Sequence, residues 1–344
     1  MSVIIPVYNG ESWLEECLQS VYHQTFAGSL ELSIYNDSST DNTASIIEEW
    51  QHKLTGKGIK VTVGTGSSDA SPKGVGYAKN RAVDSSCGKY LCFLDADDVM
   101  SPNRVEAQYN MARSLSDPTV IGSQFKRLPV DSTERFTAWA NELTPSQLYT
   151  QAYTSHGPTV IMPTWFMSRE TFDRVGEFDE SGKGTPEDLI FFYKHISLGG
   201  KLVRVDECLL TYRYHAAAAT FSVKEETIWD LRIKFIEETV LKKWSSFTIW
   251  NAGKQGRQFY RNLQEVSRDK VVAFCDVDAK KIAQKVYTYQ DSPKRPKPTV
   301  PIIHFSEAKA PIIICMKLGL TGGGFEANLD SLGLKEGEDY YHFN

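Results

Sequence analysis

Three carboxylates within four positions end an apolar segment and are the clearest chemical signal in the sequence. Residues 90–94 read Tyr-Leu-Cys-Phe-Leu, and Asp95, Asp97 and Asp98 follow them. Such a run is typical of a strand buried on both faces of a parallel sheet, whose carboxyl end faces the crevice where ligands bind. Because side chains alternate along a strand, Asp95 and Asp97 are expected on one side, where their oxygens can hold a divalent cation. The alternative is a helix N-terminus, since Ser101-Pro102 resembles an N-cap followed by a first-turn proline.

Strand-like and helix-like segments alternate along the first part of the chain. This alternation predicts βαβ units in an α/β fold, a mostly parallel sheet with helices on both faces. Strands are expected at residues 3–7, 30–35, 60–65, 90–94 and 201–205. Helices are expected at residues 13–21, 43–50, 186–198 and 227–244, with a short one that ends near residue 82. The helix at residues 227–244 is expected to close a first domain, residues 1–245.

Residues 246–344 predict a second, small Rossmann-like domain. A strand at 247–250 is followed by the loop 251–256 (Asn-Ala-Gly-Lys-Gln-Gly), a helix, and a strand that ends at Asp276. The loop is a damaged dinucleotide fingerprint, because asparagine replaces its first glycine, although Asp276 is well placed for a ribose. Roughly 100 residues are few for both domains of a dehydrogenase, so packing or acceptor binding is expected in preference to hydride transfer.

Composition and charge exclude several classes of protein. No segment approaches the roughly 20 apolar residues of a membrane span and no signal peptide is recognised, so no membrane association is expected. Six cysteines without metal-ligand spacing predict free thiols in a reducing compartment, the cytoplasm or also the nucleus. The net charge of -5 disfavours non-specific nucleic-acid binding over the whole surface. A local basic cluster remains at Lys294, Arg295 and Lys297, for which a solvated proline-rich loop is the alternative.

Five short segments follow one another in the order of a known family. They are residues 2–9 (Ser-Val-Ile-Ile-Pro-Val-Tyr-Asn), 36–41 (Asn-Asp-Ser-Ser-Thr-Asp), 76–81 (Gly-Tyr-Ala-Lys-Asn-Arg), 95–97 (Asp-Ala-Asp) and 187–188 (Glu-Asp). Together they resemble the motifs of the family-2 glycosyltransferases, which have the GT-A fold. The first domain is therefore expected to bind a nucleotide-sugar and to transfer its sugar with inversion.

The resemblance implies a nucleotide site at the ends of the first two strands. Pro6, Tyr8 and Asn9 would border the base and the ribose, and Asp37 would accept a hydrogen bond from the uracil N–H. Asn36 departs from the family's pattern, which has an acid there. From the residues alone, an Asx-type turn that caps the next helix explains this segment equally well.

The resemblance also implies a site for the diphosphate and its cation. Lys79, where the family usually has arginine, and Asn80 would lie near the diphosphate. Asp95 would face the ribose, and Asp97 would bind Mn²⁺ or Mg²⁺, which can offset the charge of a leaving nucleoside diphosphate. His215 would complete the metal shell or contact the diphosphate, and a structural histidine is the alternative.

The acceptor side is expected where the fourth predicted helix begins. Inverting transfer needs one base to take the proton of the acceptor hydroxyl, and the resemblance gives this role to Asp188, with Glu187 beside it. Without the resemblance, acids in a helix's first turn are explained by the helix dipole. Trp165 falls where such enzymes build the wall that contacts the acceptor.

The whole chain, including its C-terminal part, further resembles the enzymes that galactosylate queuosine in transfer RNA. That likeness implies UDP-galactose as donor and queuosine at the wobble position of tyrosine tRNA as acceptor. An acidic protein that binds RNA needs a local basic face. The candidates are Lys242, Lys243, Lys280, Lys281, Lys285 and the cluster at Lys294. Two alternatives stay open, namely transfer of N-acetylglucosamine to a glycan and a non-catalytic protein that binds a UDP-sugar or RNA.

Overall fold

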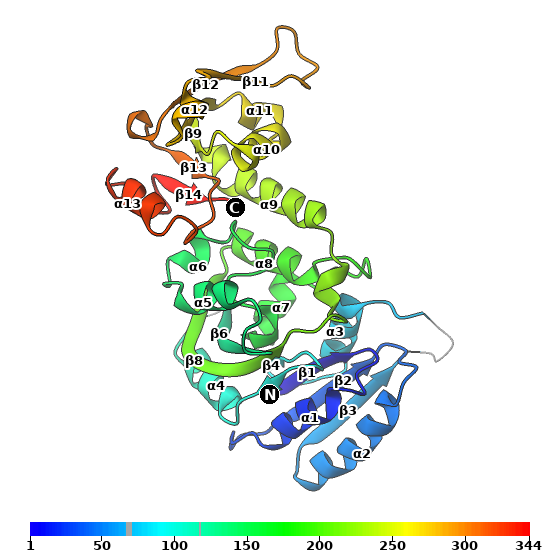
Figure 1. Ribbon diagram of the computed structural model, residues 1–344. Helices are drawn as coiled ribbons and strands as arrows, with labels where there is room; N and C mark the ends of the chain where they lie inside the picture. The colour runs from blue at the N-terminus through cyan, green and yellow to red at the C-terminus, as the bar shows by residue number, and fades with distance from the viewer. Residues whose placement is uncertain (67–70, 117) are drawn as a thin grey trace. The chain divides into compact units, whose positions relative to one another are not determined.

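The computed structural model of the chain describes residues 1–66, 71–116 and 118–344. These residues form two compact units, one of residues 1–148 and 157–224, the other of residues 149–156 and 225–344 (Figure 1). Helix α9 (Glu225–Thr239) therefore belongs to the second unit, whereas the sequence analysis placed the boundary after residue 245. Arg232 of α9 explains the difference, because its guanidinium donates hydrogen bonds to the carbonyls of Tyr153 (2.9 Å) and Asn344 (2.6 Å) within that unit.

The sheet of the first unit directs several strand ends to one edge. Its eight strands lie in the order β3-β2-β1-β4-β7-β6-β8-β5 within the described residues. They are β1 (Ser2–Val7), β2 (Glu31–Asn36), β3 (Lys60–Thr65), β4 (Tyr90–Phe93), β5 (Val99–Met100), β6 (Thr119–Leu128), β7 (Phe166–Ser168) and β8 (Lys201–Arg213). β1 to β4 are mutually parallel, and β7 is antiparallel to both β4 and β6. Since β6 and β8 are parallel, the carboxyl ends of β1, β2, β4, β6 and β8 all face the same edge.

Helices cover both faces of this sheet, which confirms the α/β class. Figure 1 shows α1 (Leu14–Tyr22) and α2 (Thr43–Gly56) on one face of β1–β3 and α3 (Val75–Asp84) on the other. The segments that follow along the chain are α4 (Arg104–Arg113), α5 (Glu134–Glu142), α6 (Gln147–Thr150), η1 (Met162–Thr164), α7 (Arg169–Val175), α8 (Glu187–Ser197) and η2 (Ala219–Ser222). α1 buries Leu14, Cys17, Leu18 and Val21, the spacing that predicted this helix.

The second unit has the strand order of a Rossmann-like module. Its sheet, again within the described residues, runs β11-β12-β10-β9-β13-β14, with only β11 antiparallel to its neighbour. The strands are β9 (Phe247–Trp250), β10 (Val271–Asp276), β11 (Val286–Thr288), β12 (Thr299–His304), β13 (Ile312–Ile314) and β14 (Tyr340–His342). The helices after α9 are η3 (Leu241–Lys243), α10 (Lys254–Asn262), α11 (Glu265–Arg268), α12 (Ala279–Ile282), η4 (Phe305–Glu307) and α13 (Gly324–Asp330). Across the described residues, no helix is both long and apolar enough to cross a membrane.

The loop between β9 and α10 is closed by the protein's own side chains. One carboxylate oxygen of Asp276 accepts hydrogen bonds from the Ala252 N–H (2.9 Å) and from Lys281 Nζ (3.0 Å). The other oxygen accepts from the N–H groups of Val277 (2.9 Å) and Asp278 (3.0 Å). The acid that a dinucleotide fold uses for a ribose thus accepts hydrogen bonds from protein donors here, and the role of this domain stays a prediction.

Substitution of Gly76, at the start of α3, tests how closely the elements around the site are packed. A Cβ atom there would lie 2.2 Å from the Asp179 carbonyl oxygen and 3.4 Å from the Glu187 Cβ. We expect Gly76→Ala to lower the free energy of unfolding by about 1–3 kcal/mol, because backbone has to move. Gly56→Ala is the matched control, since no heavy atom lies within 4 Å of its added Cβ. Urea denaturation of both variants checks this, and equal stabilities would contradict it.

Candidate functional site

The three acids after β4 form a compact cluster of oxygens. One carboxylate oxygen from each of Asp95, Asp97 and Asp98 lies within 4.8 Å of the others. A tight turn produces this arrangement, because the Asp98 N–H donates to the Asp95 carbonyl at 3.1 Å. Asp95 Oδ1 and Asp98 Oδ2 are buried and have no hydrogen-bond partner in the described part of the chain. Buried carboxylate oxygens that converge without hydrogen-bond donors fit a divalent cation, without selecting between Mn²⁺ and Mg²⁺.

His215 lies directly against the cluster. Its Nε2 is 2.9 Å from Asp97 Oδ2, and its ring stacks on the Trp13 indole with a centroid distance of 5.1 Å. The sequence analysis named Asp97 and His215 as a metal pair, and the fold brings them into contact across 118 positions of the chain. The stacked indole fixes the plane of the imidazole, which keeps one ring nitrogen directed at Asp97.

Asp98 has a larger part in the cluster than the sequence indicated. One of its oxygens, Oδ1, accepts a hydrogen bond from the Arg213 N–H of β8 at 2.9 Å. Asp98 nevertheless belongs to the acid cluster, and its Oδ2 is buried without a hydrogen-bond partner among the described residues. Burial, reinforced by the negative charges of Asp97 and Asp95, raises the pKa of the Asp98 carboxyl well above its ordinary value. The available signal was the third acid in the run, but burial could not be read from it.

A buried lysine connects the acid cluster to the start of α8. Lys79 Nζ donates to Glu187 Oε1 at 2.8 Å and lies 4.0 Å from Asp95 Oδ1, and its side chain is only 2% exposed. Burial acts to lower the pKa of Lys79, but the charges of Glu187 and Asp95 outweigh it and raise the pKa. The ammonium therefore stays charged and is shared by two carboxylates of the protein. Its expected contact with a diphosphate stays a prediction.

Asp188, the next residue of α8, has the environment of a base. It is half-buried, and its Oδ1 accepts a hydrogen bond from the Leu189 N–H at 2.7 Å. Burial and the charge of Glu187 raise the pKa of Asp188 to about 7, although Lys79 opposes the shift. Burial likewise raises the pKa of Asp95 to about 6. A carboxylate with a pKa near neutrality can take a proton from a hydroxyl far better than an ordinary aspartate can.

The loops after β1 and β2 are held together at the same edge. Asn9 Oδ1 accepts a hydrogen bond from the Thr40 N–H at 2.9 Å, and Asn36 Oδ1 accepts one from the Ser39 N–H at 3.1 Å. The second contact is a local side-chain-to-backbone hydrogen bond that does not cap the next helix, because α2 begins at Thr43 and its N-cap Asn42 makes no side-chain cap hydrogen bond. Asp37 is 3% exposed, and its two oxygens accept hydrogen bonds from the N–H groups of Lys73 (3.1 Å) and Gly74 (2.7 Å). Each oxygen keeps a lone pair, so contact with uracil stays a prediction, as do the roles of Pro6 and Tyr8.

Asn80 and Trp165, which the sequence analysis named for ligand contacts, form hydrogen bonds with other residues of the protein. The Asn80 amide donates to the Phe178 carbonyl and to Glu180, both at 2.9 Å, so both of its protons are in use. Trp165 is fully buried, its Nε1 donates to the Val160 carbonyl at 2.8 Å, and its ring packs among core phenylalanines. The acceptor-wall position expected for Trp165 is therefore corrected to a core position. Trp165 lies between η1 and β7, where the core encloses an aromatic residue that the family resemblance placed at the acceptor wall.

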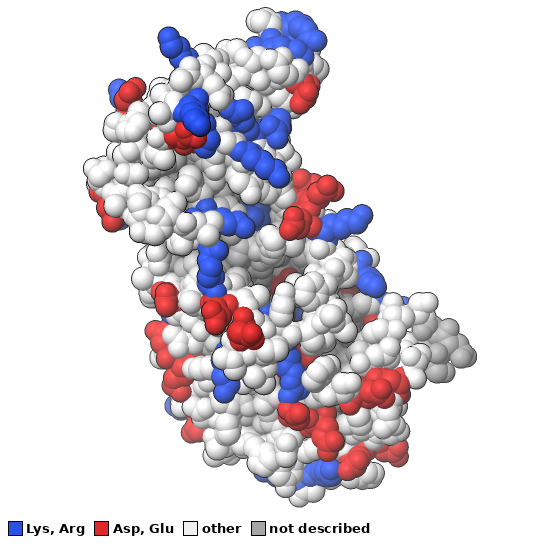
Figure 2. All heavy atoms as spheres, in the orientation of Figure 1, with Lys and Arg blue, Asp and Glu red and all other residues white. Residues whose placement is uncertain are grey.

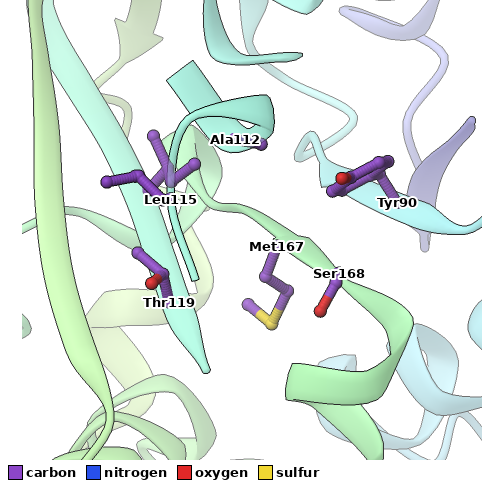
Figure 3. Close-up of a pocket in the computed structure, with 7 residues that line it drawn as sticks. Tyr90, Ala112, Leu115, Thr119, Met167 and Ser168 are labelled. Atoms are coloured by element: carbon purple, nitrogen blue, oxygen red, sulfur yellow. The ribbon is translucent and has the colours of Figure 1, made fainter. Parts of the chain in front are cut away.

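One enclosed cavity lies at the opposite edge of the sheet. It is lined by Tyr90, Ala112, Leu115, Thr119, Ile121, Met167 and Ser168 (Figure 3). Tyr90 and Thr119 begin β4 and β6, so the cavity lies at the amino ends of these strands, away from the acid cluster. Its volume of about 10 Å³ corresponds to roughly one water molecule, so it cannot admit a sugar or a nucleotide.

Relatives of the chain are glycosyltransferases. An uncharacterized glycosyltransferase of Rickettsia prowazekii (strain Madrid E), RP339, is 29% identical over 261 residues, which cover 72% of this chain and 76% of that protein. Glycosyltransferase GlyG of Streptococcus pneumoniae is 23% identical over 222 residues, 62% of this chain and 70% of its own. Among solved structures, S. aureus TarS residues 1–349 in complex with UDP-GlcNAc superposes with a TM-score of 0.51 at 20% identity, over 77% of this chain and 70% of TarS. That likeness concerns the fold, which is GT-A.

The acid cluster predicts cation binding that can be measured without turnover. We expect Asp97→Asn to weaken Mn²⁺ binding by about tenfold or more, because one charged oxygen ligand is lost. Titration calorimetry with MnCl₂ measures the affinity. Asp173→Asn, an exposed position on α7, is the control and should bind Mn²⁺ like the wild type. An unchanged affinity for Asp97→Asn would argue against this site.

The sequence profile described as Glycosyl transferase family 2 matches residues 2–176. The match runs from β1 through α7 and includes Asp37, Lys79 and the three acids after β4. These are the elements whose ends meet at the carboxyl edge of the sheet. The chain therefore belongs to glycosyl transferase family 2.

Proposed function

We propose that this protein transfers a hexose from a UDP-sugar to an acceptor hydroxyl with inversion, using Asp188 as the base. The observation that carries the proposal is the position of Asp188 beside the Glu187–Lys79 pair, which in turn reaches Asp95 of the acid cluster. A base of raised pKa and a cation site are thus joined by one buried ammonium. This is the combination that an in-line displacement of a nucleoside diphosphate requires.

The residues divide into a leaving-group side and an acceptor side. Asp95, Asp97 and Asp98, with His215 against Asp97, would hold a divalent cation, which supplies positive charge to the leaving diphosphate. Asp188 would take the acceptor proton at its free carboxylate oxygen, since the other accepts the Leu189 N–H. Lys79 donates to Glu187 Oε1, so that oxygen is already occupied beside Asp188.

A uridine donor is supported by Asp37. The Lys73 and Gly74 N–H groups fix its carboxylate at the end of β2, with lone pairs left over for an imide N–H. TarS, which is similar in fold, was solved in complex with UDP-GlcNAc. Tyr8, at the end of β1, is 49% exposed and would cover the base or ribose from that side.

For the finer assignment we propose UDP-galactose as donor and queuosine in tRNA as acceptor, on the resemblance stated above. Charge within the second unit supports an RNA partner, because residues 240–297 hold 13 Lys and Arg against 5 Asp and Glu. Figure 2 shows Lys and Arg gathered on the visible face of this unit. Lys280 and Lys285 are exposed, whereas Lys294 is paired with Glu265 at 2.7 Å and contributes less free charge.

N-acetylglucosamine transfer to a glycan is the second candidate. The UDP-GlcNAc in the TarS complex favours it, and no residue described above distinguishes N-acetylglucosamine from galactose. The two candidates differ in both donor and acceptor, so a single assay that varies both can separate them.

The raised pKa of Asp188 predicts how the transfer rate depends on pH. The base acts when deprotonated, so with a pKa of about 7 the rate at low substrate should fall roughly tenfold per pH unit below 7 and level off above it. Asp188→Asn should lose about 10²–10⁴-fold in turnover while UDP affinity is kept. Asp173→Asn on exposed α7 is the control. Wild-type turnover in Asp188→Asn would assign the base elsewhere.

Transfer to RNA predicts a hexosylated nucleoside that mass spectrometry can identify. Bulk tRNA incubated with the protein and Mn²⁺ should gain one hexose on queuosine with UDP-galactose, as seen by mass spectrometry of digested nucleosides. The double variant Lys280→Glu, Lys285→Glu should raise the KM for tRNA at least about tenfold and leave UDP affinity unchanged. Lys309→Glu with Lys335→Glu, outside residues 240–297, is the matched control. A product only with UDP-GlcNAc and a glycan would favour the second candidate.

A further inference from the structure

Arg127 is a cationic residue at the carboxyl edge that the proposed mechanism does not use. It lies near the end of β6, in register with Tyr212 of β8. The next pair in that register is Leu128 with Arg213, and the Arg213 N–H donates to Asp98 Oδ1. Arg127 therefore pairs with Tyr212, the residue that precedes Arg213, whose N–H binds Asp98 of the acid cluster.

Aromatic rings hold the guanidinium of Arg127. Its Cζ lies 4.4 Å from the centroid of Tyr212, 5.0 Å from Tyr214, 5.3 Å from Phe136 and 5.8 Å from Phe125. Rings that cover the faces of a guanidinium leave its N–H groups free in the plane. The charge is therefore held in one orientation without being neutralised.

The in-plane donors of Arg127 lack a partner. Nε and Nη1 are buried and make no hydrogen bond within the described residues, and Arg127 forms no ion pair there. Burial lowers the pKa of this guanidinium, a shift that the nearby Tyr212, Tyr214 and Asp98 oppose. Arginine is nonetheless charged at any physiological pH, so an unpaired buried fork is costly unless a ligand satisfies it.

We propose that Arg127 binds a phosphate oxygen of the substrates at this edge. A planar fork matches the tetrahedral oxygens of a phosphate, and the aromatic cage preorganises it. The phosphate belongs either to the diphosphate of the donor or to the backbone of an RNA acceptor. The inference rests on the proposed function for these two sources. Arg127 as a whole is half-buried, and Phe136 of its cage also lines an open hollow with Asp131, Glu134 and Arg135.

Arg127→Met tests the proposal, because it keeps an unbranched chain within the cage and removes the fork. UDP and uridine affinities are measured by calorimetry with Mn²⁺, and the KM for tRNA with UDP-galactose. If the donor supplies the phosphate, UDP affinity falls at least about tenfold and uridine affinity is unchanged. If the acceptor supplies it, UDP affinity is kept and the KM for tRNA rises by a similar factor. Arg127→Lys should recover part of either loss, because it retains the charge.

Arg113→Met is the matched control, since Arg113 also lies over a tyrosine ring (Tyr109, 5.8 Å) but is exposed at the end of α4. Values for Arg127→Met equal to this control would overturn the inference, as would equal losses for UDP and uridine. A change in Mn²⁺ affinity alone would also overturn it, because Arg127 would then act through Asp98. If the wild type binds no UDP, the proposed function fails separately, and binding of pyrophosphate then decides the role of Arg127.

Discussion

The buried ion pair between Lys79 and Glu187 is the interaction on which the site depends. It joins α3 to α8, and the same ammonium lies 4.0 Å from Asp95 after β4. Burying charges is costly, and an isolated pair rarely returns that cost. Here one cation is shared by two acids whose positions the active site requires, so the pair fixes three elements at once. The close approach at Gly76 is the steric counterpart of this link, because a side chain there would hold the Asp179 segment and Glu187 away from α3.

The balance of charge around that pair explains the raised pKa values. Asp95, Glu187 and Asp188 lie near the buried Lys79 ammonium, and Arg104 also acts on Asp95 and Asp98, so burial and mutual repulsion of the acids are only partly offset. The pKa of Asp95 rises to about 6 and that of Asp188 to about 7. A divalent cation and protons therefore compete for the cluster, and metal affinity should weaken as the pH falls through about 6. Burial and the charge of Glu187 likewise raise the pKa of Asp188, the proposed base.

In the second unit, the acid that dinucleotide-binding folds use for a ribose accepts hydrogen bonds from protein donors. The strand order of this unit is that of a Rossmann-like module, yet Asp276 accepts four hydrogen bonds from protein donors. Asn251, at φ 127°, donates its side-chain N–H to the Cys315 carbonyl and so closes the first loop onto β13. The basic stretch of residues 240–297 in this unit is the feature on which the proposed RNA partner rests. A fold-level likeness alone would have suggested a dinucleotide.

The sequence determined the elements and the chemistry that they carry. Periodicity located β3 at residues 60–65 and β9 at 247–250. The run of acids after β4 indicated the acid cluster, because this pattern is also local. Tertiary structure decided the partners: Lys79 pairs with a carboxylate 108 positions away, and Trp165 is enclosed between layers. The lack of hydrogen-bond partners for Arg127 Nε and Nη1 among the described residues is seen only once β6 and β8 are paired. Long-range contacts select which side chains neutralise each other, and no spacing rule in a single sequence encodes that selection.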